Sequence, residues 1–214
     1  MYNITLLSSF HLEDGRCNPT ELYRIIESIQ PDVIFEELCS DTFDVAYSDG
    51  CIPNTIEAKT IKMYLQNHLI NHFPVDTYEF SESDMFDKYT MITENSADYL
   101  ELLSKLYFSA VHFGYSFLNS DECVEIIEKM HIVEDSVLSE INDAKISCQY
   151  RKWREINSKR EDEMIRNIYN FSKQHQYNNA MFICGAEHRK PIMQKIQEIE
   201  KTSAIKLNWN FYNS

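Results

Sequence analysis

Apolar and polar positions in the first 80 residues form two kinds of segment. Three short stretches, 2–9 (YNITLLSS), 31–38 (PDVIFEEL) and 73–80 (FPVDTYEF), are apolar and contain β-branched and aromatic residues, as buried strands do. Residues 18–29 and 55–72 instead carry apolar side chains at helical spacing. This alternation of strand and helix predicts a parallel sheet.

The middle of the chain has a different pattern. Residues 82–176 contain no stretch that we predict to be a strand, and three long segments have the helical period: 96–118, 120–142 and 150–175. The sequence therefore predicts a large helical insertion over residues 82–176.

The α/β pattern returns near the end, with a strand at 178–185, a helix at 187–202 and a final strand at 204–212. We therefore expect an α/β fold in a single domain, residues 1–214, with a mostly parallel sheet of about five strands flanked by helices. Residues 39–54 are rich in Ser, Asp and Asn and predict a loop.

The net charge of the chain limits the kinds of partner that it can bind. The chain has 214 residues and a net charge of −14, so its acidic surface disfavours nucleic acid and anionic membranes. We find no apolar run near the roughly 20 residues that span a bilayer and no basic leader segment. These features predict a cytoplasmic protein whose six cysteines, none spaced as CxxC, stay reduced.

Candidate functional residues follow the predicted strands. His11 follows the first strand, Glu36 and Glu37 end the second, and His188 follows the fourth in the stretch GAEH (185–188). Parallel strands end at one rim of a sheet, where ligands bind in such folds. Neighbouring side chains of a strand point to opposite faces, so we expect one of the two glutamates to face the site.

Other ionisable residues rank below this set. Asp14 and Glu79 also lie near predicted strand ends and are weaker candidates for the same rim. The remaining histidines lie in predicted helices, where we expect ordinary packing or solvated roles: His68, His72, His112, His131 and His175.

Four short motifs, in order along the chain, resemble those of the TraB/Tiki and erythromycin-esterase superfamily, also called EreA/ChaN-like. They are SSFH (8–11), FEE (35–37), REDEM (160–164) and GAEH (185–188). The family has Gly-x-x-His after the first strand, Glu after the second, Arg in a helix, and a second Gly-x-x-His. This chain departs from it at Ser8, where the family has glycine. The resemblance covers about residues 1–80 and 155–200.

The resemblance implies a hydrolase of ester, lactone or peptide bonds, with His11, Glu36 or Glu37, Arg160 and His188 in one His/Glu/Arg cluster. It acts on a small-molecule or peptide substrate. A histidine takes the proton from water directly, or His11, Glu37 and His188 hold a divalent Mn²⁺ or Zn²⁺ that acidifies the water. Arg160 either stabilises the oxyanion or makes a surface ion pair with a nearby glutamate.

Two other classes stay open: a haem- or metal-binding protein that uses the same histidines, and an interaction module without chemistry. The oligomeric state is open too. We interpret Gly185 as the residue that lets the chain turn tightly off its strand, so that His188 lies in the first turn of a helix with a positive N-terminus. The cluster should lie within roughly 10 Å.

Overall fold

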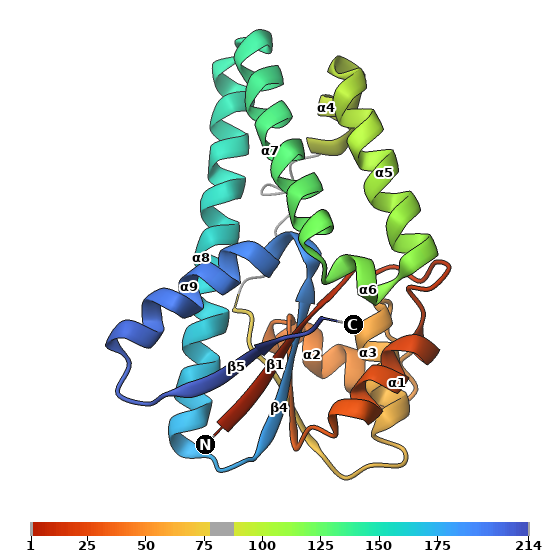
Figure 1. Cartoon of the computed structure of the whole chain (residues 1–214), viewed down its shortest axis with the longest axis vertical. Helices are drawn as coiled ribbons and strands as arrows, with labels where there is room; N and C mark the ends of the chain where they lie inside the picture. The colour runs from red at the N-terminus through yellow and green to blue at the C-terminus, as the bar shows by residue number, and fades with distance from the viewer. Residues whose placement is uncertain (1, 78–87, 214) are drawn as a thin grey trace.

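The computed structural model describes residues 2–77 and 88–213 and has an α/β fold (Figure 1). Its sheet has five strands in the order β3-β2-β4-β1-β5, and every pairing is parallel. The strands are β1 (Tyr2–Ser9), β2 (Val33–Glu36), β3 (Asn71–Pro74), β4 (Asn179–Gly185) and β5 (Leu207–Phe211). The predicted fold class, including the parallel sheet, is confirmed.

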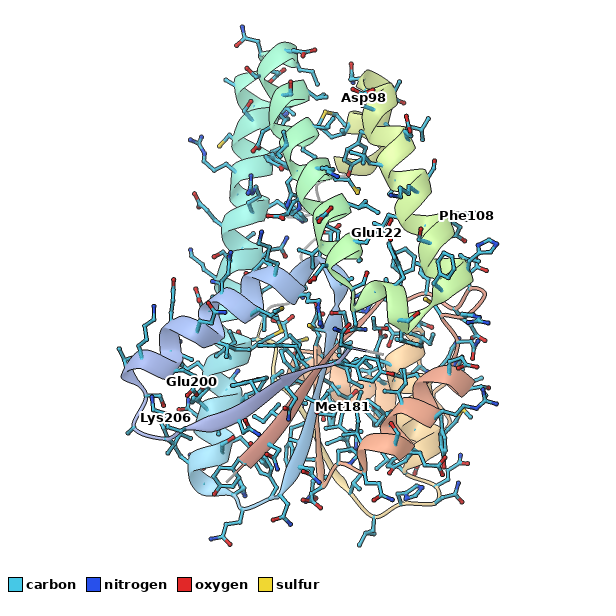
Figure 2. All side chains as sticks on the ribbon, viewed as in Figure 1. Asp98, Phe108, Glu122, Met181, Glu200 and Lys206 are labelled. Carbon is cyan, nitrogen blue, oxygen red and sulfur yellow. The ribbon has the colours of Figure 1, made fainter. Side chains whose placement is uncertain are left out.

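Both faces of the sheet are buried, which explains the continuous apolar runs of its central strands. Along β4, Met181 and Ile183 join the hydrophobic core on one face, whereas Phe182 and Cys184 join the core on the other. Met181 accordingly lies deep in the molecule, while Phe108 projects from its helix toward solvent (Figure 2).

Helices cover each face. The first core contains side chains of α1 (Pro19–Ile29) and α3 (Ile56–Tyr64), and the second contains those of α9 (Arg189–Thr202). Helix α1 begins where the sequence predicts, because the side chain of Asn18 accepts a hydrogen bond from the backbone of Glu21 and Pro19 occupies the first turn.

The described part of the predicted insertion is helical. Residues 88–174 form helices that are joined by short connections. Its helices are α4 (Lys88–Asn95), α5 (Ala97–Phe113), α6 (Tyr115–Leu118), α7 (Asp121–Ile141) and α8 (Ala144–Gln174). Figure 1 shows α4, α5, α7 and the start of α8 standing beyond the carboxyl end of β4. We call these helices the lobe.

Helix α8 belongs to both the lobe and the sheet layer. Its 31 residues extend about 46 Å at 1.5 Å per residue. Met164, Ile168 and Tyr169, in its second half, pack in the same core as Phe182 of β4. The insertion therefore supplies one of the two helices that cover this face of the sheet.

Two expectations about the segment from residue 39 to residue 80 are wrong. The predicted loop 39–54 contains a helix, α2 (Ser40–Tyr47), which Tyr47 anchors through its hydroxyl to Glu36. Helix α3 ends at Tyr64, so His68 lies in the turn after it and His72 lies in β3. Contacts with the sheet decide these boundaries, and local sequence does not encode them. Glu79 lies outside the described residues.

Asn119 ties the connection between α6 and α7, at the base of the lobe, to the sheet. It follows α6, and its side-chain oxygen accepts hydrogen bonds from the backbone of Ser8 in β1 (2.8 Å) and from the guanidinium of Arg189 in α9 (2.8 Å). Its amide nitrogen donates to the carbonyl oxygens of Ser8 (3.1 Å) and Tyr115 (2.9 Å). One buried amide thus fixes three elements.

None of the helices in residues 2–77 and 88–213 combines the length and apolar character needed to cross a membrane.

We predict that Asn119→Ala lowers the free energy of unfolding by about 1–3 kcal/mol, because it leaves buried donors and acceptors of β1 and α9 unpaired. Urea denaturation measures this change. Asn95→Ala is the control, because Asn95 is exposed and its amide donates to the carbonyl oxygen of Met91 within α4; it should cost less than about 0.5 kcal/mol. Equal losses in the two variants would contradict the joining role of Asn119.

Candidate functional site

Three adjacent strands bring the candidate residues together. Strand β4 lies between β1 and β2, and Ser9 of β1 is in register with Gly185 of β4. His11 leaves β1, Glu37 leaves β2 and His188 follows β4, all at the carboxyl end of the sheet. Their convergence follows from the parallel pairing and from the central position of β4.

The carboxylate of Glu37 is the centre of the site. Its Oε1 accepts from Nη2 of Arg160 at 2.8 Å and lies 3.2 Å from Nε2 of His188. Its Oε2 accepts from the backbone N–H of Gly185 at 2.7 Å and lies 3.8 Å from Nε2 of His11. Burial alone would raise the pKa of Glu37, but the charges of His188, His11 and Arg160 hold that pKa well below its usual range.

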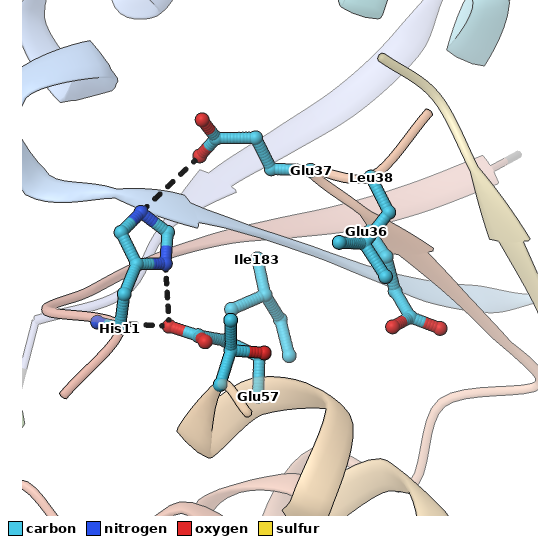
Figure 3. Close-up of a pocket in the computed structure, with 7 residues that line it drawn as sticks. His11, Glu36, Glu37, Leu38, Glu57 and Ile183 are labelled. Atoms are coloured by element: carbon cyan, nitrogen blue, oxygen red, sulfur yellow. Dashed lines mark hydrogen bonds and ion pairs between the residues drawn. The ribbon is translucent and has the colours of Figure 1, made fainter. Parts of the chain in front are cut away.

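His11 is held by Glu57, in the first turn of α3. Oε1 of Glu57 accepts from the backbone N–H of His11 at 3.2 Å and lies 3.1 Å from its ring Nδ1 (Figure 3). His11 has φ of 62°, in the left-handed region that is costly for a residue with a side chain. Burial lowers the pKa of His11, but Glu57 and Glu37 outweigh it and raise that pKa to about 9.

His188 lies between two carboxylates. It ends the 3₁₀ turn Ala186–His188 that precedes α9, and only 11% of its side chain is exposed. Its Nδ1 is 2.9 Å from Oε1 of Glu161, and its Nε2 faces Glu37. The two acceptors outweigh the effect of burial and raise the pKa of His188 to about 10, so both ring nitrogens carry protons at neutral pH.

Arg160 is a mostly buried positioning group, and its ion pairs with Glu37 and Asp76 lie inside the site. Its side chain is 11% exposed, and its Nε and Nη2 donate to Oδ2 of Asp76 at 2.9 and 2.7 Å. Nη2 also donates to Glu37, and Nη1 donates to Asn157 at 2.9 Å. The guanidinium thus joins α8 to the ends of β2 and β3 and fixes the carboxylate of Glu37.

Glu36 points away from this cluster, to the other face of the sheet. Its carboxylate accepts from the hydroxyl of Tyr47 at 2.6 Å and lies 2.7 Å from Nδ1 of His72. Burial raises the pKa of Glu36 despite these two partners. Of the two adjacent glutamates, Glu37 is therefore the one that faces His11 and His188.

Gly185 is needed for a reason other than the predicted tight turn. Its φ of −60° and ψ of 146° are accessible to any residue. A Cβ at this position, however, would lie 2.7 Å from Nε2 of His11 and 3.6 Å from Oε2 of Glu37. The glycine therefore provides space for the imidazole of His11 against the end of β4.

Two cavities meet at His11 and Glu37. A small one, about 20 Å³ in volume, lies between His11, Glu37 and Glu57 and has room for one water molecule (Figure 3). A larger one of about 600 Å³ lies under the lobe, and its polar lining includes His11, Glu37, Arg160 and His188. Most of its remaining surface is apolar.

His11, Glu37 and His188, the predicted metal ligands, meet at this rim, where the carboxylate of Glu37 accepts hydrogen bonds from Arg160 and Gly185. Nδ1 of each imidazole lies beside a second carboxylate, that of Glu57 for His11 and that of Glu161 for His188. Among the described residues no group of three His, Cys, Asp or Glu side chains is arranged to hold a metal ion. The metal expectation stays a prediction.

Sequence reasoning missed three carboxylates of the site: Glu57, Asp76 and Glu161. Asp76 lies two residues beyond β3, so the rim argument would have selected it if the end of that strand had been placed correctly. Glu161 is adjacent to Arg160 in the chain, and Glu57 looks like an ordinary acidic residue in a first helical turn. The weaker candidate Asp14 instead accepts a hydrogen bond from Tyr107 of α5.

We predict that Gly185→Ala lowers the free energy of unfolding by about 1–3 kcal/mol, because the new methyl overlaps the imidazole of His11. In a His11→Ala background the same change should cost at least about 0.5 kcal/mol less. Chemical denaturation of the four proteins of this double-mutant cycle measures the difference. Equal costs in both backgrounds would contradict the steric role of Gly185.

No protein-family model, curated protein or solved structure matches this chain. The resemblance to the TraB/Tiki and erythromycin-esterase superfamily therefore stays a prediction that rests on the four motifs.

Proposed function

We propose that this protein is a hydrolase of ester, lactone or peptide bonds that works at the carboxyl rim of its parallel sheet. The observation that carries the proposal is the convergence of His11 and His188 on Glu37 at the edge of the 600 Å³ cavity. A concave, mostly apolar space with a few convergent ionisable groups is the usual form of a small-molecule active site.

His11 is the proposed general base. Glu57 accepts a hydrogen bond from Nδ1–H, which leaves the lone pair of a neutral ring at Nε2. Nε2 and Oε2 of Glu37 are 3.8 Å apart, too far for a direct hydrogen bond but suitable for one water between them. This water gives one proton to His11 as its oxygen attacks the carbonyl carbon.

His188 is the proposed acid. Its Nε2–H lies 3.2 Å from Glu37, at the long end of hydrogen-bond distances, and turns to the developing oxyanion or the leaving group. When the acyl bond breaks, the leaving oxygen or nitrogen takes this proton, and the products are a carboxylic acid and an alcohol or amine. Arg160 acts indirectly, because it positions Glu37.

The cytoplasm is the proposed location, because all six cysteines, each within the described ranges, carry free thiols. The proposed substrate is a small molecule or peptide that enters the cavity under the lobe. The mechanism uses only side chains of this chain and no metal ion.

We predict that His11→Asn and His188→Gln each lower kcat/KM for ester substrates by about 10²–10⁴-fold, because each removes a proton-transfer group. Initial rates with nitrophenyl esters and small peptides measure this. His112→Asn, at an exposed position in α5, is the matched control and should retain full activity.

A chelator should leave the wild-type rate unchanged, and added Mn²⁺ or Zn²⁺ should not raise it. Wild-type rates in either His11→Asn or His188→Gln would contradict the proposal. Haem absorbance in the purified protein, without turnover of any substrate, would favour the binding-protein class instead.

We predict a bell-shaped dependence of kcat/KM on pH. His11 must be neutral, so the rate rises with pH through its pKa of about 9, and His188 must keep its proton, so the rate falls above about 10. Glu57→Gln removes a group that raises the pKa of His11, so the rising limb should move to lower pH. An unchanged rising limb in Glu57→Gln would contradict the pairing of Glu57 with the base.

A further inference from the structure

The lobe gives the 600 Å³ cavity an apolar wall. The wall is built from side chains of α5, α7, α8 and the segment after β1: Phe10, Leu103, Leu106, Ile127 and Trp153. Leu106 and Ile127 are only 6% and 7% exposed, so they are fixed in the core of the lobe. A bulky apolar group therefore has space directly beside His11 and Glu37.

A second cavity, of about 300 Å³, adjoins the first and is more polar. The two share Trp153, Asn157, Glu187 and His188, which form their common boundary. Four further ionisable side chains line the second cavity: His131, Arg154, Glu161 and Lys195. His188 thus separates an apolar space from a polar one.

We infer that the site takes neutral esters with a medium-length apolar acyl chain and a polar, hydroxyl-bearing alcohol; this inference rests on the proposed hydrolase. The acyl chain occupies the apolar cavity, and the alcohol occupies the polar one. His188 gives its proton to the leaving oxygen and lies at the boundary, so the alcohol departs on the polar side.

The opposite orientation, with the alcohol in the apolar cavity and the acyl chain in the polar one, is disfavoured by the side chains that line the two cavities. Hydroxyl groups placed against Leu103, Leu106 and Ile127 would lose hydrogen bonds to water without protein partners. A charged peptide would meet the same cost. The reaction consumes one ester and one water, breaks the acyl–oxygen bond and yields a fatty acid and the alcohol, with His11 taking one proton and His188 giving one.

Two isomeric esters test the orientation. Monooctanoylglycerol carries the apolar chain on the acyl side, whereas octyl glycerate carries it on the alcohol side. We expect kcat/KM to be at least about tenfold higher for monooctanoylglycerol. Within the acylglycerols, kcat/KM should rise about fourfold for each methylene from butanoyl to octanoyl, as expected for burial of apolar chain.

Substitution of a residue in the apolar wall tests whether the acyl chain binds in the 600 Å³ cavity. Leu103→Trp narrows the apolar cavity and should lower kcat/KM for monooctanoylglycerol by more than about tenfold while leaving monobutanoylglycerol within about twofold. Leu100→Trp, on the same helix but 52% exposed and outside the cavity, should change neither rate. Thermal unfolding checks that both variants fold. If Leu103→Trp does not fold, Leu103→Phe is used in its place.

The outcomes separate the inference from the proposed function. Equal rates for the two isomers, or equal losses with both acyl chains in Leu103→Trp, would overturn the inference and leave the hydrolase standing. Absence of turnover by the wild type for every ester, lactone and peptide substrate, at every pH tested, would overturn both.

Discussion

The ion pairs of Glu37 are the interaction on which the rest of the site depends. A carboxylate 8% exposed at the end of a central strand is stable only if cations and hydrogen-bond donors surround it. Arg160 from α8, His188 after β4 and the backbone of Gly185 supply them. Satisfying one buried charge therefore brings the end of β2, helix α8 and the end of β4 to one point.

The same site contains local features that are costly for stability. His11 has a left-handed backbone, and Gly185 leaves a strand end without a side chain. The buried carboxylate of Glu57 interacts with His11 and Ser9, and these contacts hold its pKa below the usual value despite burial. Backbone strain at the residue that carries the imidazole is typical of a functional site, since it reduces stability and needs another reason to be there.

Much of this arrangement could be predicted from sequence, because strand and helix periods are local properties. The apolar run 2–9 and the run 178–185 identified two neighbouring strands, and parallel pairing then placed His11 and His188 at one rim. Strand alternation showed that Glu36 and Glu37 diverge, but which of them meets the histidines depends on packing on each face. Helix α2, strand β3 and the role of Glu57 depend on tertiary contacts, and no local pattern encodes them.

A titration of the imidazole resonances of His11 and His188 by NMR tests the central claim most directly, that Glu37 gathers two protonated histidines. The account predicts pKa values of about 9 for His11 and about 10 for His188, and a lower value for both in Glu37→Gln. Titration of both rings near the ordinary value of 6.5, unchanged in Glu37→Gln, would contradict it.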